Sequence, residues 1–247
     1  MDMKLAGRTV LIAGGSRGIG FACAMGFAAE GCAVHIASRS KESLEAARDK
    51  IRARHNVPIE IHPADLSKGD TARSVVEAVA HADILVNNAG AIPRGDIFGM
   101  TEPKWREAWE LKVFGYVNAT RAMLEKFYVR KKGVVVNIIG LAGESFNYDY
   151  VAGTMGNAGL MAFTRAVGSR SVDHGVRVVA IAPGVFETPM MAAMSAEARQ
   201  SLEAQVPFPS RLGRPSEYAA LALHIVENVM LNGTTLRLDG ALRMGSK

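Results

Sequence analysis

Cysteine is nearly missing from this chain, since its 247 residues include only Cys23 and Cys32. Two cysteines cannot build the disulfide framework of a small secreted domain, and they favour a reduced, cytoplasmic environment. No stretch reaches the roughly 20 apolar residues that span a bilayer. The first residues, MDMKLAGRTV, lack the apolar core of a signal peptide. We therefore expect a cytoplasmic protein with no membrane partner.

Dense basic clusters are also scarce, although the chain carries a formal net charge of +5. Arg130, Lys131 and Lys132 form the one dense run, and aromatic residues do not interleave with it as they do in a nucleic-acid-binding stripe. We interpret this run as a solvated helix C-terminus, where the helix dipole favours cations. Nucleic acid is not an expected partner.

Linkers, low-complexity tracts and internal repeats are absent, so nothing divides the chain. A chain of this length with 49% hydrophobic residues can bury one large core. Short runs rich in Val and Ile alternate with longer segments of helical period, which is typical of βαβ units around a buried parallel sheet. We predict an α/β fold over residues 1–247, a single doubly wound domain of the Rossmann type. Its seven-stranded parallel sheet is flanked by helices.

The predicted strands cover residues 9–12, 33–37, 59–62, 84–86, 134–138, 176–181 and 235–238. The predicted helices cover residues 19–29, 41–55, 68–80, 104–130, 151–173 and 215–226. Residues 188–214 differ from this pattern, because Met190, Met191 and Met194 precede two prolines. We predict a mobile helical flap there, although methionines at this spacing also suit plain packing.

A glycine-rich turn follows the first predicted strand and leads directly into a helix. It reads Ala13-Gly14-Gly15-Ser16-Arg17-Gly18-Ile19-Gly20. Glycines allow the sharp turn and let backbone N–H groups approach a pyrophosphate, while the helix N-terminus favours its negative charge. The strand before and the helix after the turn predict a dinucleotide site. Its predicted residues here are Gly14, Ser16, Arg17, Gly18, Ile19 and Gly20.

The spacing of Gly14, Gly18 and Gly20 resembles the TGxxxGxG turn of the short-chain dehydrogenase/reductase family, with Ala13 in place of the usual Thr. Three further matches follow in order: Asp65-Leu66, Asn87-Asn88-Ala89-Gly90, and Pro183-Gly184 with Thr188. The resemblance implies that Asp65 and Leu66 contact adenine and that Asn88, Ala89 and Gly90 line the adenosine ribose. It also implies that Val185 and Thr188, beside Pro183 and Gly184, hold the nicotinamide amide. The alternative is that all of these are merely turn residues of a Rossmann-like sheet.

The end of the second predicted strand bears on the choice of cofactor. An acidic residue there would bind the ribose 2′-OH and favour NAD. This chain has Ser38 and Arg39 instead, and Arg17 lies in the glycine-rich turn. Two guanidinium groups would make charge-assisted contacts with a 2′-phosphate, so we predict NADP(H) over NAD(H).

All four positions where the family keeps its catalytic Tyr, Lys, Ser and Asn carry other residues. In the family, the Tyr transfers the proton and the Lys four residues later lowers its pKa. Alignment of the helix at 151–173 places Gly153 at the Tyr position and Asn157 at the Lys position. Gly140 falls at the Ser position and Lys112 at the Asn position. A Tyr-x-x-x-Lys pattern does occur at residues 128–132, but it precedes the fifth strand and lies at the wrong end of the sheet.

We hypothesise a relocated pair, with Tyr150 as proton donor and Lys112 as its electrostatic partner. Small side chains at the exchanged positions leave room for the Lys112 stem to swing inward. Tyr150 lies three residues before Gly153, close to one helical turn. The alternatives are that Lys112 points to solvent and that Tyr150 is an ordinary loop residue.

The C-terminal residues 205–244 are similar to the tail of type II 3-hydroxyacyl-CoA dehydrogenases within this family. The resemblance implies an NADP(H)-dependent oxidoreductase acting on a small carbonyl or hydroxyl substrate, such as a 3-oxoacyl or 3-hydroxyacyl thioester. The alternative is a nucleotide-binding sensor or structural paralogue without turnover. We expect a homo-oligomer, a tetramer or dimer assembled through the helices at 104–130 and 151–173, and we predict no metal site.

Overall fold

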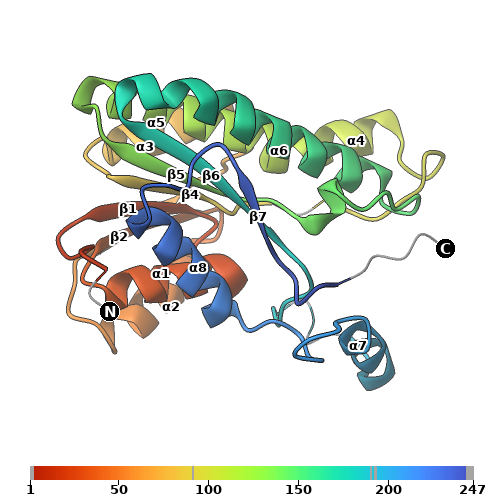
Figure 1. The fold of residues 1–247 in the computed structure, drawn as a ribbon. Helices are drawn as coiled ribbons and strands as arrows, with labels where there is room; N and C mark the ends of the chain where they lie inside the picture. Colours follow the sequence, from red (N-terminus) through yellow and green to blue (C-terminus); the bar gives the residue numbers. More distant parts are fainter. Residues whose placement is uncertain (1–2, 91, 190, 192–193, 243–247) are drawn as a thin grey trace.

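The computed structural model describes residues 3–90, 92–189, 191 and 194–242. In this part of the chain, one seven-stranded sheet has the order β3-β2-β1-β4-β5-β6-β7 and is parallel throughout (Figure 1). The strands are β1 (Thr9–Ala13), β2 (Ala33–Ser38), β3 (Ile59–Pro63), β4 (Ile84–Asn87), β5 (Gly133–Ile138), β6 (Val176–Pro183) and β7 (Thr235–Leu238). The predicted fold class is confirmed, and each predicted strand is present.

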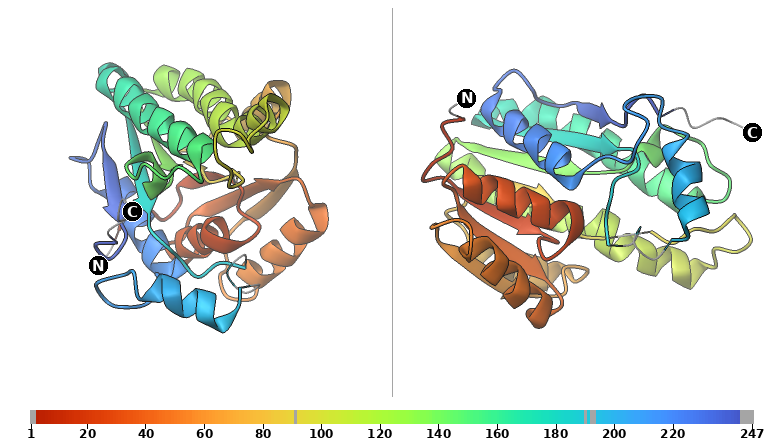
Figure 2. Two further views of the ribbon diagram at one scale, coloured as in Figure 1. Left: turned by 90° about the vertical axis from the view of Figure 1, so that its right-hand side faces the viewer. Right: turned by 90° about the horizontal axis from the view of Figure 1, so that it is seen from below.

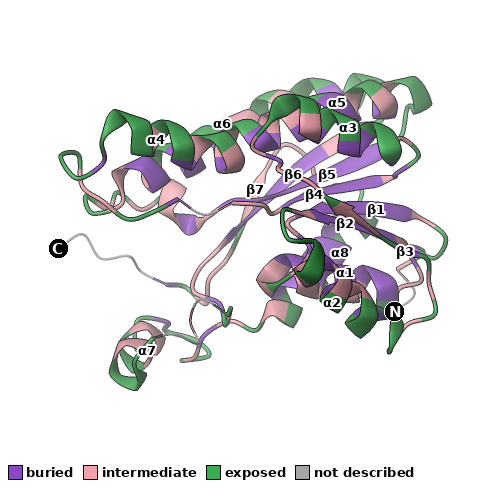
Figure 3. Ribbon diagram, turned by 180° about the vertical axis from the view of Figure 1, so that it is seen from behind, coloured by how far each residue is buried: buried purple, intermediate pink, exposed green. Residues whose placement is uncertain are grey.

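Helices cover both faces of the sheet. One layer contains α3 (Gly69–Ala78), α5 (Gly115–Arg130) and α6 (Val151–Ser171), and the other contains α1 (Gly18–Ala29), α2 (Lys41–Arg52) and α8 (Pro215–Glu227). Side chains alternate along each strand, so Val34 and Ile36 pack toward the second layer while Ala37 packs toward the first. Both faces of the central strands are therefore buried (Figure 3). Among the described residues, no helix is both long and apolar enough to cross a membrane.

The helix predicted at residues 104–130 is present, but it contains a π-helical turn. The chain forms α4 (Glu102–Trp109), then a π-helical turn (Glu110–Phe114), and only then α5. A π-helical turn accommodates one extra residue and changes the direction in which its side chains point. Lys112 is the one buried residue recorded for this turn, so the interruption accompanies the burial of a cation.

A chain of buried polar side chains ties the centre of the sheet to the first helical layer. Asn87 at the end of β4 donates to Asn137 Oδ1 on β5 and to Thr120 Oγ1 on α5, both at 2.9 Å. Asn137 in turn donates to Thr164 Oγ1 on α6 at 3.0 Å. Buried amides are costly unless they are hydrogen-bonded, so this network fixes how β4, β5, α5 and α6 lie against one another.

The basic run lies exposed at the C-terminal end of α5, as predicted, and it also makes specific contacts. Arg130 donates to the carbonyls of His81 and Ala82, and Lys132 forms an ion pair with Asp83. These cations therefore hold the segment that leads into β4. The Tyr-x-x-x-Lys pattern of residues 128–132 lies directly before β5, as predicted, at the opposite end of the parallel strands from the glycine-rich turn.

The segment at 188–214 contains α7 (Ala196–Glu203), a helix with no buried residue, which stands away from the sheet in both views of Figure 2. Met190 lies outside the described residues, and Met194 is 37% exposed. Arg199 on α7 binds Glu187 and Glu203. The helix in this segment is present as predicted, and its movement as a flap stays a prediction.

Candidate cofactor and active site

The glycine-rich turn and the loop after β4 are locked together. Gly14 has a φ of +83°, and a Cβ atom there would lie 2.8 Å from the backbone of Ala89. Asn88 donates from Nδ2 to the Gly14 carbonyl at 2.7 Å. Only glycine combines this backbone conformation with so close an approach. Two predicted cofactor motifs therefore form one continuous wall.

The N-terminus of α1 is open to an anion. Its N-cap residue, Arg17, makes no side-chain capping bond, and the first turn contains no acidic residue. Gly18 has a φ of +58°, and a Cβ atom there would lie 3.8 Å from Thr188. Gly18 and Thr188 also line one cavity of about 800 Å³ beside α1. Free N–H groups at the positive end of a helix are suited to a pyrophosphate, and the first and last motifs converge beside them.

The end of β2 carries an unsatisfied buried group. The hydroxyl of Ser38 is buried and has no hydrogen-bond partner within the described structure. Arg17 and Arg39 are exposed. Neither side chain makes a hydrogen bond or an ion pair with the residues that the structure describes. A ligand that carries a hydroxyl or phosphate here would satisfy Ser38 and neutralise the guanidinium groups. The residues present therefore fit the adenosine end of a dinucleotide.

Asp65 has a local role besides the predicted contact with adenine. Its carboxylate accepts hydrogen bonds from the hydroxyl of Ser67 at 2.7 Å and from its N–H at 3.1 Å. These bonds, with smaller contributions from the positive charges of Arg39 and Lys68, hold the pKa of Asp65 below its usual value. The carboxylate thus shapes the turn after β3, while Leu66 is buried in the adjacent core.

The other predicted cofactor residues also lie at the carboxyl ends of β1, β4 and β6. Gly90 packs against Lys112, Gly184 packs against Asp239, and Val185 joins a small apolar cluster with Leu141 and Val206. Parallel α/β sheets bind ligands at this edge. The residues placed there are Gly14, Ser16, Gly18, Ile19, Gly20, Asn88, Ala89, Gly90, Pro183, Gly184, Val185 and Thr188.

Lys112 does not point to solvent, so that alternative is wrong. The side chain is buried, and its Nζ donates to the carbonyl of Ile138 at 2.6 Å and to the hydroxyl of Tyr116 at 3.0 Å. Tyr116 donates to the same carbonyl at 2.7 Å. Burial lowers the pKa of Lys112 to about 7, so the amine can gain or lose a proton near neutral pH.

Tyr150 fills the space that the glycine at 153 leaves open. A Cβ atom at Gly153 would lie 2.1 Å from both Cε1 and Cζ of the Tyr150 ring. The ring is half-buried, and burial raises the pKa of its hydroxyl, while Arg94 lowers it to a smaller extent. In the described structure no hydrogen bond joins Tyr150 to Lys112, whose partners are Tyr116 and Ile138.

Asn157 is buried beside Gly140 and Gly153. Its Nδ2 donates to the Gly153 carbonyl at 2.7 Å, and its buried Oδ1 has no hydrogen-bond partner among the described residues. A Cβ atom at Gly140 would lie 3.0 Å from this oxygen. The absence of a side chain at Gly140 thus makes room for Asn157, whose Oδ1 remains a buried acceptor without a partner among the described residues.

Comparison with known proteins settles the family. A profile of the short chain dehydrogenases matches residues 8–199. The chain belongs to the short-chain dehydrogenase family. It is 30% identical to 3-oxoacyl-(acyl-carrier-protein) reductase FabG of Aquifex aeolicus, over 98% of this chain and 100% of that protein. It is also 30% identical to 3-hydroxyacyl-CoA dehydrogenase type-2 of Drosophila melanogaster, over 95% of this chain and 96% of the relative.

A solved structure agrees with this placement. L-sorbose reductase from Gluconobacter frateurii, in complex with NADPH and L-sorbose, superimposes with a TM-score of 0.91 at 25% identity over the whole of both chains. The short-chain dehydrogenase fold is thus retained along the full length of this chain.

Two residues of the site were missed from the sequence. Tyr116 lies four residues after Lys112, a helical spacing that signals contact. Arg94 acts on Tyr150 from a loop, and no spacing rule connects the two residues. The side-chain partner of Lys112 therefore comes from the first turn of α5, and the charge that acts on Tyr150 comes from a loop.

Proposed function

We propose that this short-chain dehydrogenase is an NADP(H)-dependent oxidoreductase that interconverts a carbonyl and a hydroxyl group on a small molecule. Bound NADP(H) would supply or accept the hydride. The turn at residues 14–20 binds the pyrophosphate, Ser38, Arg17 and Arg39 hold the 2′-phosphate, and Thr188 orients the nicotinamide amide. Support comes from the free guanidinium groups, the unsatisfied Ser38 hydroxyl and the NADPH complex of L-sorbose reductase.

Tyr150 transfers the proton in this proposal. Its ring occupies the volume next to Gly153, the position that the family gives to a tyrosine. This observation carries the proposal, because the Tyr150 ring lies against the backbone from which the family's tyrosine would project. Its hydroxyl gives a proton to the substrate oxygen during reduction and removes it during oxidation.

Lys112 stabilises the charge that develops during this transfer. The ammonium is buried in a medium of low dielectric, where a positive charge favours a nearby phenolate or alkoxide more strongly than it does in water. Tyr116 and the Ile138 carbonyl hold its Nζ in one place. The amine is thus fixed before the reaction, without cost at the moment of proton transfer.

The proposed substrate is a 3-oxoacyl or 3-hydroxyacyl thioester. Phe98, Phe146 and Tyr148 are 86%, 91% and 58% exposed. They lie on two loops that the Gly95 backbone joins, by hydrogen bonds with Asp149 and Val151. Exposed apolar side chains beside a candidate site suit an acyl chain better than a sugar. Both relatives named above bear names of acyl-carrier or acyl-CoA enzymes.

We also propose assembly into a homo-oligomer, a tetramer or dimer, through α5 and α6. A groove of about 440 Å³ lies between these helices, and its lining includes Val117, Leu124, Phe163 and Val167. Apolar side chains on a paired helical surface are typical of subunit contacts. Sedimentation velocity of the purified chain measures the state directly.

The test of the function begins with fluorescence titration of NADPH and NADH, followed by turnover of acetoacetyl-CoA and of L-sorbose. We expect preferential binding of NADPH and reduction of the thioester. Tyr150→Phe should lower kcat by about 100-fold or more at unchanged NADPH affinity. The matched control, Tyr148→Phe, removes a hydroxyl from the neighbouring exposed ring and should leave kcat unchanged.

Each other outcome has a definite meaning. Unchanged turnover in Tyr150→Phe would contradict the assignment of the proton donor. Tight NADPH binding without turnover of any carbonyl substrate would favour the nucleotide-binding sensor over the enzyme. Failure to bind either nucleotide would overturn the proposed function as a whole.

A further inference from the structure

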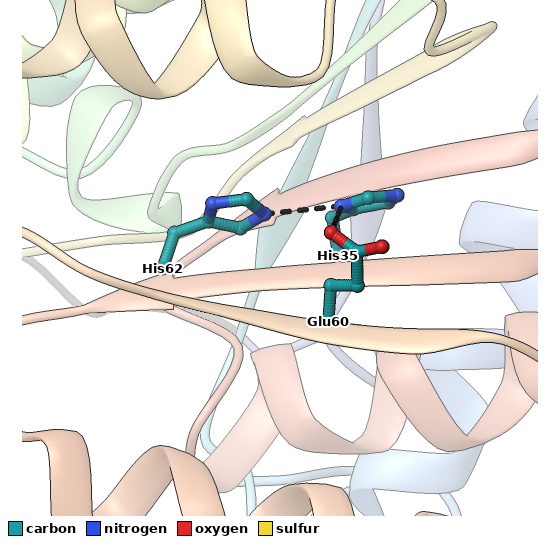
Figure 4. A group of neighbouring side chains, drawn as sticks. All are labelled: His35, Glu60 and His62. Atoms are coloured by element: carbon teal, nitrogen blue, oxygen red, sulfur yellow. Dashed lines mark hydrogen bonds and ion pairs between the residues drawn. The ribbon is translucent and has the colours of Figure 1, made fainter.

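Three side chains of types that ligate metals converge at the edge of the sheet, away from the proposed reaction site. His35 lies on β2, and Glu60 and His62 lie on β3, which is the edge strand of the described sheet (Figure 4). The register pairs His35 with Glu60. Since side chains alternate along a strand, Glu60 and His62 project to the same face, so the pairing of β2 with β3 builds the cluster.

The spacing of the ligand atoms is close to that of a tetrahedral metal site. His35 Nδ1 lies 3.0 Å from His62 Nε2 and 3.7 Å from Glu60 Oε2. All three candidate atoms lie within 4.8 Å of one another. Zinc–nitrogen and zinc–oxygen bonds near 2.1 Å separate tetrahedral ligands by roughly 3.4 Å. Small side-chain rotations would therefore bring the three atoms around one ion.

In contrast to the expectation from the sequence, we propose that His35, Glu60 and His62 bind one Zn²⁺ ion. Two imidazoles and one carboxylate are an established type of ligand set for this cation, with water completing the tetrahedron. His35 is 5% exposed, whereas the Glu60 side chain is 68% exposed and has room to close over the ion. The buried histidine fixes the position of the metal, and the exposed glutamate provides its route of entry.

The proton between the two histidines has a defined destination. Without metal, one of the two facing nitrogens carries the hydrogen of the hydrogen bond between His35 and His62. Binding requires both facing nitrogens to present lone pairs, so that proton moves to the far nitrogen of the same ring. The imidazoles stay neutral, and no oxidation or reduction occurs.

The consequence for the fold is a clamp between β2 and β3. A cation bound by both strands stabilises the folded state and has little affinity for the unfolded chain, so it raises the free energy of unfolding. The role is structural and does not depend on the proposed oxidoreductase activity. It also gives an edge strand a second attachment besides its backbone hydrogen bonds.

The experiment uses the untagged full-length protein and Zn²⁺ in competition with a chromophoric chelator, together with Co²⁺ as a spectroscopic probe. We expect one Zn²⁺ per chain with a micromolar or tighter Kd and the intense visible absorption of tetrahedral Co²⁺. Zn²⁺ should also raise the Tm. Glu60→Gln and His62→Gln should each raise the Kd at least about tenfold.

His81→Gln is the matched control. The His81 ring packs edge-on against His35 at a centroid distance of 5.6 Å, yet His81 is not part of the ligand cluster. Its substitution should leave the Kd within about twofold of the unaltered protein. Equal weakening by His81→Gln and His62→Gln would overturn the assignment of the ligands, and so would the absence of one-to-one binding. Glu60 is exposed, so Glu60→Gln tests the site without disturbing the core.

Discussion

The two halves of the site are built differently. The cofactor half, around the glycine-rich turn and the loop after β4, depends on backbone: a glycine at positive φ, free N–H groups and an amide that holds two loops together. The substrate half, around Lys112 and Tyr150, depends on side chains that occupy one another's space. The first half keeps the predicted cofactor motifs, apart from Ala13 in place of the usual Thr, and the second is predicted to differ from the family at four catalytic positions. Backbone geometry tolerates little change, whereas side-chain chemistry can be supplied from a neighbouring position.

In the cofactor half, the addition of a single methyl group should be enough to disrupt NADPH binding. Gly14→Ala places a methyl group 2.8 Å from the Ala89 backbone at a φ of +83°. We expect NADPH binding to fall by about 100-fold or more, because the wall shared by two motifs must open. Isothermal titration calorimetry measures the loss. Gly7→Ala is the matched control, since Gly7 also has a positive φ, of +76°, but its Cβ would meet nothing within 4 Å. Equal binding losses in both variants would mean that strain, and not the contact with Ala89, is the cause.

In the substrate half, removal of the buried charge of Lys112 should make the folded protein more stable. The pKa of Lys112 falls from 10.5 to about 7 on folding, so the unfolded chain binds more protons between these pH values. Stability of the unaltered protein therefore rises with pH across this window, and the cost of burying the amine is fully present below it. Lys112→Met should raise the free energy of unfolding by a few kcal/mol at about pH 6, since each pKa unit corresponds to ~1.4 kcal/mol. The gain in the free energy of unfolding should shrink as the pH rises toward 10.5. The same substitution should lower the turnover of the enzyme.

Urea unfolding at both ends of this pH range measures the effect. The exposed Lys104 supplies the control, and Lys104→Met should shift stability by less than about 0.5 kcal/mol at either pH. A gain for Lys112→Met that is independent of pH would contradict the buried-amine explanation. A simultaneous gain in stability and loss of turnover would identify Lys112 as a residue kept for function.

Substitution of the arginines in the cofactor half tests which part of the dinucleotide they contact. Arg17→Gln and Arg39→Gln should each weaken NADPH binding by about tenfold and leave NADH binding nearly unchanged, because each removes charge-assisted hydrogen bonds to the 2′-phosphate. Titration of the two nucleotides against each variant provides the ratio. Arg54, which lines the cavity beside α1 but lies outside the proposed phosphate site, serves as the control. Parallel loss of NADPH and NADH affinity would show that the arginines contact a part common to both.

The smallest effect is expected at Tyr128. Its ring stacks on His174 at a centroid distance of 3.9 Å, near the start of β6 and away from the carboxyl edge of the sheet. Tyr128→Phe keeps the stacking and removes the hydroxyl, so kcat should stay within about twofold. The assay used for Tyr150→Phe serves here too. A large decrease would mean that the Tyr-x-x-x-Lys pattern of residues 128–132 takes part in catalysis.

The fold and the cofactor half were predictable because their signals are local. Runs of Val and Ile mark buried strands, and the glycine-rich turn announces its own geometry within a few residues. The helix at 104–130 was predicted without its π-helical turn, since hydrophobic periodicity barely registers one extra residue. Local signals therefore give element type well and phase poorly.

The substrate half could not be predicted to the same depth because its contacts join distant parts of the chain. Lys112 meets a carbonyl 26 residues later, on a strand whose distance no spacing rule provides. Tyr150 was identified from its separation from Gly153, but the direction of its ring depends on loops held together by Gly95. The cluster of His35, Glu60 and His62 depends on the register of β2 against β3, which the sequence of neither strand determines alone.

The π-helical turn at Glu110–Phe114 determines the direction in which the Lys112 side chain points. Each residue of an α-helix advances by about 100°, so one residue more or less in this turn rotates everything on one side of it relative to the other. Deleting a single residue there would leave the composition of the site intact and turn either the amine or the buried face of α5 out of place. A buried charge can thus be gained or lost through an insertion or deletion in this turn that leaves every functional side chain in the sequence.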